Sequence, residues 1–155
     1  MKKIKIFSSF LLITLLLVST ALYAQQKTAA DIKKMVESKS FVFKAETARP
    51  MRGGNRQLSV GYDLTINPTS VVAYLPFFGR AQTIPIEATD GGIKFSSANF
   101  QYEVTTKKQG WGVTIKTNDV SDVRQLYLTI YDNGNATLDV MNINRDDISF
   151  TGYIR

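Results

Sequence analysis

Residues 126–140 read LYLTIYDNGNATLDV, and this stretch decides the predicted fold. Every second residue from Leu126 to Ile130 is apolar, which is the period of a β-strand with one buried face. Asn133-Gly134 follows, a pair that suits a type I′ hairpin turn, and the alternation resumes after it at Ala136. The stretch therefore predicts a β-hairpin of two half-buried strands.

The same period of two extends through most of the chain on both sides of this hairpin. Leu58 to Ile66 alternates most regularly, and the run over residues 83–88 is the weakest because Pro85 favours an edge or a bulge. Gly152 stands where the apolar face of the last strand has no side chain. Further alternating or β-branched segments span residues 41–46, 70–75, 93–95, 100–104, 111–115 and 148–154. From about residue 40 onward the pattern predicts nine or ten short strands.

Short turns join most of these strands, which favours a meander in which each strand pairs with the next. A meander of this length curls, and closure removes its exposed edges. The expected fold is therefore all-β: a lipocalin-like antiparallel up-and-down β-barrel with one short N-terminal helix. A two-sheet sandwich is the alternative architecture.

The helix is expected over residues 28–39. Thr28 is a suitable N-cap, and Asp31 three residues later completes a capping box. Ile32, Met35 and Val36 form one apolar stripe. A helix this short is marginal alone, so its stripe is expected to dock on the barrel, at one end or along the side. A free amphipathic tail is the alternative.

Residues 1–24 have the pattern of a secretory signal peptide. Three lysines precede an apolar run from Phe10 to Val18, and small residues lead to a predicted cut after Ala24, with a second suitable site at Ala21. The run is too short to span a membrane, although an uncleaved anchor is the alternative. The chain has no cysteine to carry a lipid. We expect an exported protein of the Gram-negative periplasm, with residues 25–155 forming a single β-barrel domain.

Charge and composition exclude several classes of function. Three of the 19 lysines and arginines lie in the signal peptide, which leaves 16 basic against 13 acidic residues and a net charge of +3. This balance does not indicate nucleic-acid binding. The chain has no histidine and no cysteine, which excludes Ser-His-Asp and Cys-His catalysis, the usual zinc sites and thiol redox chemistry. The mature form is expected to be a monomer without a transmembrane span.

Paired carboxylates are the remaining route to catalysis, since two of them can cleave a glycosidic bond. The candidates are Asp119 with Asp122 and Asp146 with Asp147, but both pairs lie in polar connections where solvated turn residues are the simpler interpretation. Asp132 to Asn135 resembles part of a calcium loop, but it lacks the glutamate that the loop needs. No enzymatic activity, cofactor or metal is therefore expected.

The strongest candidate for a functional surface is Tyr74 to Ala81, which reads YLPFFGRA. Phe77 or Phe78 could project at the barrel mouth beside Arg80 and form an apolar pocket with one cation. The structural interpretation is that Pro76 ends a strand, that one phenylalanine enters the core, and that Arg80 covers apolar surface. The basic loop with Arg49, Arg52 and Arg56 is a further candidate for an anionic partner.

Several motifs together resemble the secreted bacterial proteins grouped as domain of unknown function 4251. They are the Leu75-to-Ala81 segment, Phe41-x-Phe43, Gly91-Gly92-Ile93-x-Phe95, Gly110-Trp111 and Ile148-Ser149-Phe150-x-Gly152. The resemblance runs from about Phe41 to the C-terminus. It implies a lipocalin-type barrel and an exported location, and it supplies no catalytic residue. The glycine-x-tryptophan signature of lipocalins near the first strand is absent.

Two functional hypotheses follow. The first is a non-enzymatic periplasmic binding module for a small apolar or amphipathic ligand, with Phe77, Phe78 and Arg80 at the rim. The second is an envelope structural or protein-interaction module, with a filled barrel and the same three residues as the partner surface.

Overall fold

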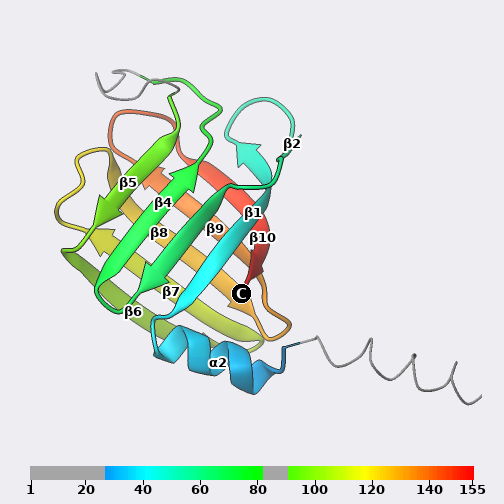
Figure 1. Cartoon of the computed structure of the whole chain (residues 1–155). Helices are drawn as coiled ribbons and strands as arrows, with labels where there is room; N and C mark the ends of the chain where they lie inside the picture. The colour runs from blue at the N-terminus through cyan, green and yellow to red at the C-terminus, as the bar shows by residue number, and fades with distance from the viewer. Residues whose placement is uncertain (1–26, 82–90) are drawn as a thin grey trace, which may run out of the picture.

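The computed structural model describes residues 27–81 and 91–155, which form one sheet and one short helix joined by turns and loops (Figure 1). The predicted strand over residues 83–88 and the predicted signal peptide over residues 1–24 lie outside the described residues. The elements in chain order are α2 (Ala29–Glu37), β1 (Phe41–Pro50), β2 (Arg56–Gln57), β3 (Asp63–Asn67), β4 (Ser70–Leu75), β5 (Ile93–Ser97), β6 (Phe100–Lys107), β7 (Gly110–Thr117), β8 (Val123–Tyr131), β9 (Asn135–Asn142) and β10 (Ile148–Ile154).

The strands form a single antiparallel sheet that curls into a nearly closed barrel, as predicted. Its order is β5-β4-β3-β1-β10-β9-β8-β7-β6, with β2 pairing only β1. In Figure 1, β1, β3, β4 and β5 cross the front while β7, β8 and β9 cross behind them. Apart from the two-residue strand β2, consecutive strands within the described residues pair with each other except β5 and β6, which are the two ends of the sheet.

The side chains that face inward form one apolar core. They come from alternate positions of the strands, so Trp111, Val113 and Ile115 are buried together as the sequence predicted. The side chains with no exposed surface include Phe43, Leu64, Ile66, Val71, Val113, Ile115, Leu126, Leu128, Ile130, Leu138 and Phe150.

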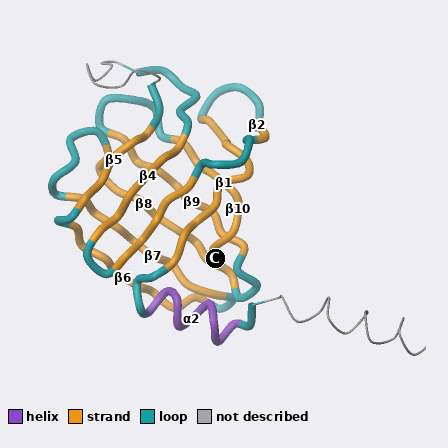
Figure 2. The backbone as a smooth tube through the Cα atoms, in the orientation of Figure 1, coloured by secondary structure: helices purple, strands orange, loops and turns teal. Residues whose placement is uncertain are grey.

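Helix α2 packs across one end of the barrel, which rules out the free-tail alternative (Figure 2). The predicted capping box is present: Asp31 N donates to Thr28 Oγ1 at 3.2 Å, and Thr28 N donates to Asp31 Oδ2 at 3.0 Å. Ile32 and Val36 are fully buried. The hydroxyl of Tyr102 donates to the carbonyl of Val36 at 2.8 Å, and burial raises the pKa of this phenol.

The long strand predicted from Leu58 to Ile66 is wrong in its first half. Leu58 N donates to Glu46 O at 2.8 Å and Ala45 N donates to Tyr62 O at 3.0 Å, so residues 58 and 62 contact consecutive residues of β1. The three residues between them have no place in the ladder and bulge outward, and Val60 is fully exposed. We call residues 58–62 the outer loop.

Asp119 holds the corner where β5 passes to β6. Its carboxylate accepts a hydrogen bond from the Ser97 hydroxyl and, through Oδ2, from the backbone N–H groups of Ala98 at 2.9 Å and Asn99 at 3.0 Å. These hydrogen bonds favour the charged form, with the bond from Ser97 the largest cause, and they lower the pKa of Asp119.

This corner predicts a specific dependence of stability on pH. Because the folded-state pKa lies below the ordinary value of 3.8, the stabilisation by Asp119 is present above that value and is lost as the pH falls through the folded-state pKa. We expect Asp119→Asn to lower the melting temperature by a few degrees at about pH 6 and by progressively less as the pH falls below 3.8 and through the folded-state pKa. Asp132→Asn, in an exposed turn, is the control. A difference between wild type and Asp119→Asn that does not shrink on acidification would contradict the assignment.

Candidate ligand-binding site

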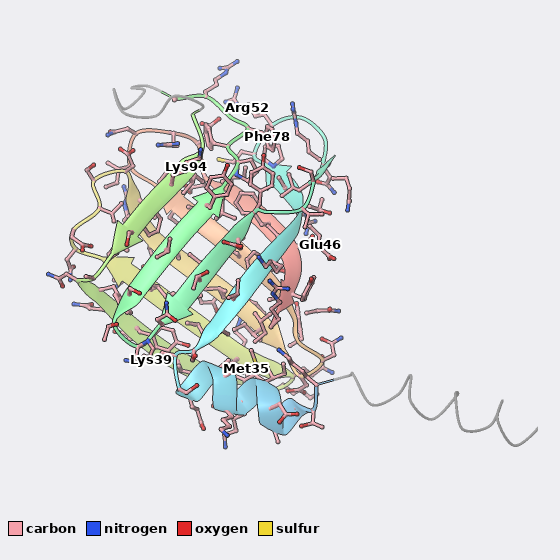
Figure 3. The ribbon with its side chains drawn as sticks, in the orientation of Figure 1. Met35, Lys39, Glu46, Arg52, Phe78 and Lys94 are labelled. Atoms are coloured by element: carbon pink, nitrogen blue, oxygen red, sulfur yellow. The ribbon has the colours of Figure 1, made fainter. Side chains whose placement is uncertain are left out.

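The predicted functional segment closes the barrel end opposite α2 (Figure 3). After β4, residues 76–81 cross to the β9–β10 connection, where Arg80 N donates to Asp146 Oδ2 at 3.1 Å and Asp146 N donates to Arg80 O at 3.0 Å. Gly79 fits this crossing because a Cβ there would lie 2.8 Å from Cζ of Phe77 and 3.2 Å from Cβ of Asp146, so a larger residue would displace the Phe77 ring. The segment is thus a corner in which both the N–H and the carbonyl of Arg80 are hydrogen-bonded to Asp146.

The three predicted site residues are placed in two different environments. Phe77 and Phe78 are both half-buried and pack against the core. Arg80 is exposed, and its side chain makes no hydrogen bond, ion pair or ring contact with the described part of the chain. The cations that lie over the two rings are others: Arg145 is 5.2 Å from the Phe77 centroid, and Arg56 is 4.5 Å from that of Phe78.

Arg145 joins three loops at this end of the barrel and was not singled out from the sequence. Its guanidinium pairs with Asp122 at 3.0 Å and donates to the carbonyls of Gly91 at 3.2 Å and Gly92 at 3.3 Å. Only 6% of its side chain is exposed. These partners are 23 to 54 residues away in sequence, so no local pattern around Arg145 could have indicated them.

The carboxylates considered for catalysis are engaged in structural contacts. Asp119 holds the β5–β6 corner and Asp122 pairs with Arg145, as described above. Asp146 accepts from Arg80 N, and Asp147 accepts from Asn142 N at 2.8 Å. Within residues 27–81 and 91–155, no three acidic side chains gather into a group that could hold a metal ion.

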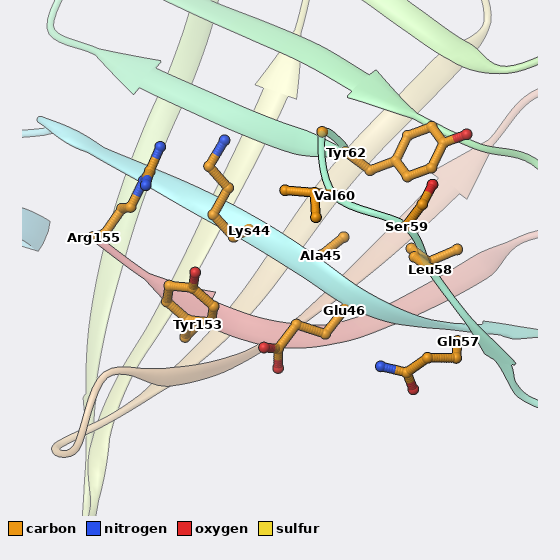
Figure 4. A pocket seen from close by; sticks show the side chains of 11 residues that line it. Lys44, Ala45, Glu46, Gln57, Leu58, Ser59, Val60, Tyr62, Tyr153 and Arg155 are labelled. Carbon is orange, nitrogen blue, oxygen red and sulfur yellow. The ribbon is translucent and has the colours of Figure 1, made fainter.

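A hollow of about 290 Å³ lies on the outside of the barrel beneath the outer loop (Figure 4). It exists because the outer loop leaves the sheet while β1 and β10 continue below it. The residues that line the hollow are Lys44, Ala45, Glu46, Gln57, Leu58, Ser59, Val60, Gly61, Tyr62, Tyr153 and Arg155. The sequence did not reveal this hollow, because the apolar alternation of residues 58–62 was interpreted as a continuous strand.

The hollow combines apolar walls with two cations. Leu58, Val60 and the Tyr62 ring supply carbon surface, and Lys44 and Arg155 extend to the same side in Figure 4. Lys44 is already paired with Asp63. The Arg155 guanidinium has no hydrogen-bond or ion-pair partner among the residues that the structure describes, so its charge is available to a ligand.

A second hollow of about 310 Å³ adjoins the first. It lies at the helix end of β10 and shares Tyr153 and Arg155 with the first hollow. Its other lining residues are Lys27, Ile32, Asn133, Gly134, Asn135 and Ile154. Arg155 therefore stands between two neighbouring depressions, and an elongated molecule could occupy both.

Aromatic stacking connects the first hollow to the stretch from Tyr74 to Ala81. The rings of Tyr62 and Tyr74 lie 5.7 Å apart at an angle of 13°, and the Lys94 ammonium lies 4.6 Å from the Tyr74 centroid. The outer loop is thereby held against the β4 surface, so its position is supported by more than the two backbone hydrogen bonds to β1.

Comparisons with known proteins agree on one family. The model of the domain of unknown function DUF4251 matches residues 23–154. The chain is similar to the crystal structure of a DUF4251 family protein from Bacteroides eggerthii DSM 20697, with a TM-score of 0.59 and 14% identity over 81% of this chain and 85% of that one. This likeness concerns the fold alone. No curated protein matches the chain.

Proposed function

The chain belongs to the DUF4251 family, whose function is unknown, and we propose that it is a non-enzymatic binding protein for a small amphipathic anion. The ligand would lie in the hollow beneath the outer loop. The observation that carries this proposal is the unpaired Arg155 guanidinium at the edge of an apolar hollow of about 290 Å³. Small-molecule sites begin at about this size and combine apolar walls with a few polar groups.

The chemistry of the lining selects the ligand class. A carboxylate or phosphate would accept hydrogen bonds from Arg155, whereas the charge of Lys44 is already balanced by Asp63. The apolar part would pack on Leu58, Val60 and the Tyr62 ring. Glu46 lines the opposite side of the hollow and disfavours a second anionic group there.

The proposed compartment is the periplasm of a Gram-negative bacterium. The pattern of residues 1–24 supports export, and the family match begins at residue 23, next to the predicted cut after Ala24. No helix in the described part of the chain has the length and apolar character needed to cross a bilayer.

An envelope protein-interaction module is the alternative function. The observation that favours it is the packing of the core, where large side chains such as Phe43 and Phe150 are fully buried. In this alternative, the surface around Phe77, Phe78 and Arg80 would meet the partner, and the two half-buried rings would contribute less contact area than Arg80.

The test has two stages. Native mass spectrometry of the protein from its own host should reveal a co-purifying amphipathic anion. Dansyl-labelled undecanoic acid then serves as a fluorescent probe, and we expect Arg155→Gln to weaken its binding about tenfold through loss of a charge-assisted hydrogen bond. Arg52→Gln, an exposed arginine outside the hollow, should leave binding unchanged.

Absence of binding at probe concentrations up to about 1 mM would refute the proposal. A Kd of about 1 mM corresponds to a binding free energy of about −4 kcal/mol. Equal binding by Arg155→Gln and wild type would mean that the probe binds outside this hollow. The surface around Phe77, Phe78 and Arg80 would then be the next candidate site.

A further inference from the structure

Strand β6 is a free edge of the sheet. It pairs with β7 along its whole length and with no other strand in the described ranges (Figure 1). Its last five residues, Glu103 to Lys107, are all exposed. This includes Val104, an apolar residue that is 41% exposed although its partner in the ladder, Val113, is fully buried.

The hydrogen-bonding groups of β6 alternate between β7 and the free edge. Asn118 N donates to Asn99 O at 2.9 Å, and the register from there to Lys107 has no irregularity. In an antiparallel pair, bonded and non-bonded positions alternate, so the odd-numbered residues bond β7. The backbone groups of Tyr102, Val104 and Thr106 therefore point away from β7 and are available to another strand.

We infer that this edge pairs with the same edge of a second copy of the chain. The two β6 strands run antiparallel about a two-fold axis at Thr105, which places Val104 of each copy opposite Thr106 of the other. The pair extends the sheet through backbone hydrogen bonds that β6 cannot form alone. The inference does not depend on the proposed ligand, and it replaces the monomer expected from the sequence with a dimer of defined register.

The charges on β6 select this register and this partner. A two-fold axis at Thr105 brings Glu103 of each copy opposite Lys107 of the other, which forms two opposite-charge pairs on the outer face. An axis at Glu103 would instead oppose two identical carboxylates. Glu103 has no partner within the described residues, and Lys107 makes only exposed contacts, with the Thr129 hydroxyl at 3.3 Å and the Tyr127 ring at 5.0 Å.

A disulfide at the axis provides the first test, because the chain has no cysteine of its own. In the proposed register, Thr105 faces itself at a position not bonded across the axis, where Cα atoms lie about 4.5 Å apart, within the range for a disulfide. Thr105→Cys should form a covalent dimer on mild oxidation. Gln101→Cys is the control, since it is on the same strand but cannot meet its own copy. Equal cross-linking of the two variants would overturn the inference.

Charge exchange provides the second test. Size-exclusion chromatography with light scattering should detect the wild-type dimer at about 0.1 mM, because an interface this small is weak. Glu103→Lys should weaken dimerisation about three- to tenfold, and the double variant Glu103→Lys/Lys107→Glu should restore it. Circular dichroism confirms that each variant is folded. A wild-type protein that remains monomeric at this concentration, or a double variant as weak as Glu103→Lys, would overturn the inference.

Discussion

Gly152→Ala is expected to destabilise the protein by about 3 kcal/mol or more, the largest effect of any substitution considered for this chain. Gly152 lies on β10 opposite Ala45 of β1, next to the point where the register of the pair shifts. A Cβ at Gly152 would overlap the carbonyl oxygen of Lys44 and lie 2.9 Å from its carbonyl carbon. Because both obstacles are backbone atoms at the centre of the sheet, no side-chain movement can relieve the contact.

Thermal and urea unfolding measure this effect, and a domain of this size should lose about 10 °C in melting temperature. Gly54→Ala is the matched control, because its backbone does not require glycine and no atom lies within 4 Å of the added Cβ. A Gly152→Ala variant as stable as Gly54→Ala would mean that β1 and β10 do not approach each other as described.

Arg145→Met is expected to have the second largest effect, lowering the free energy of unfolding by about 2–3 kcal/mol. Methionine fills much of the same volume over Phe77 but lacks the guanidinium that pairs with the Asp122 carboxylate and donates to the carbonyls of Gly91 and Gly92. This expected loss is smaller than the loss from breaking a fully buried ion pair, because the Asp122 side chain is 30% exposed and water screens part of its charge.

Arg145→Lys separates charge from geometry. Lysine keeps the charge but cannot donate to three acceptors in the planar arrangement of a guanidinium, so its stability should lie between those of Arg145→Met and wild type. Arg124→Met is the control, since Arg124 is exposed and its side chain makes no hydrogen bond, ion pair or ring contact within the described residues. Urea unfolding measures all three variants, and equal stability of Arg145→Met and Arg124→Met would contradict the role of Arg145.

The sequence was most informative where local signals and burial agree. The hairpin, the alternation on either side of its turn and the capping box at Thr28 were predicted correctly. The type I′ turn at Asn133-Gly134 was wrong, because only Gly134 has a positive φ, of 84°, and Gly134 N donates to Tyr131 O at 2.9 Å. Leu58 to Ile66 alternates most regularly of all, yet within this segment the strand begins only at Asp63. The alternation reflects two different environments: Leu64 and Ile66 face the core, while Tyr62 stacks on Tyr74 outside the barrel and Val60 faces solvent.

The candidate site was less predictable because it depends on contacts between distant segments. The sequence indicated that Pro76 ends a strand within the YLPFFGRA stretch. The pairing of its backbone with Asp146 and of its rings with Arg145 and Arg56 depends on the nearly closed barrel. The hollow beneath the outer loop arises from an interruption of strand pairing. Arg155, the last residue, carries no local pattern that could distinguish it from a solvated terminus.

The central position of β10 has a consequence for the order in which the barrel can form. β1 and β10 lie side by side in the middle of the sheet, although they are the first and last strands to be synthesised. Until the seven residues of β10 exist, β3, β4 and β5 have no connection through the sheet to β6, β7, β8 and β9. Contacts between sequence ends are slow to form because they close the longest loop. The two halves of the barrel therefore cannot join through the sheet until β10 has been synthesised.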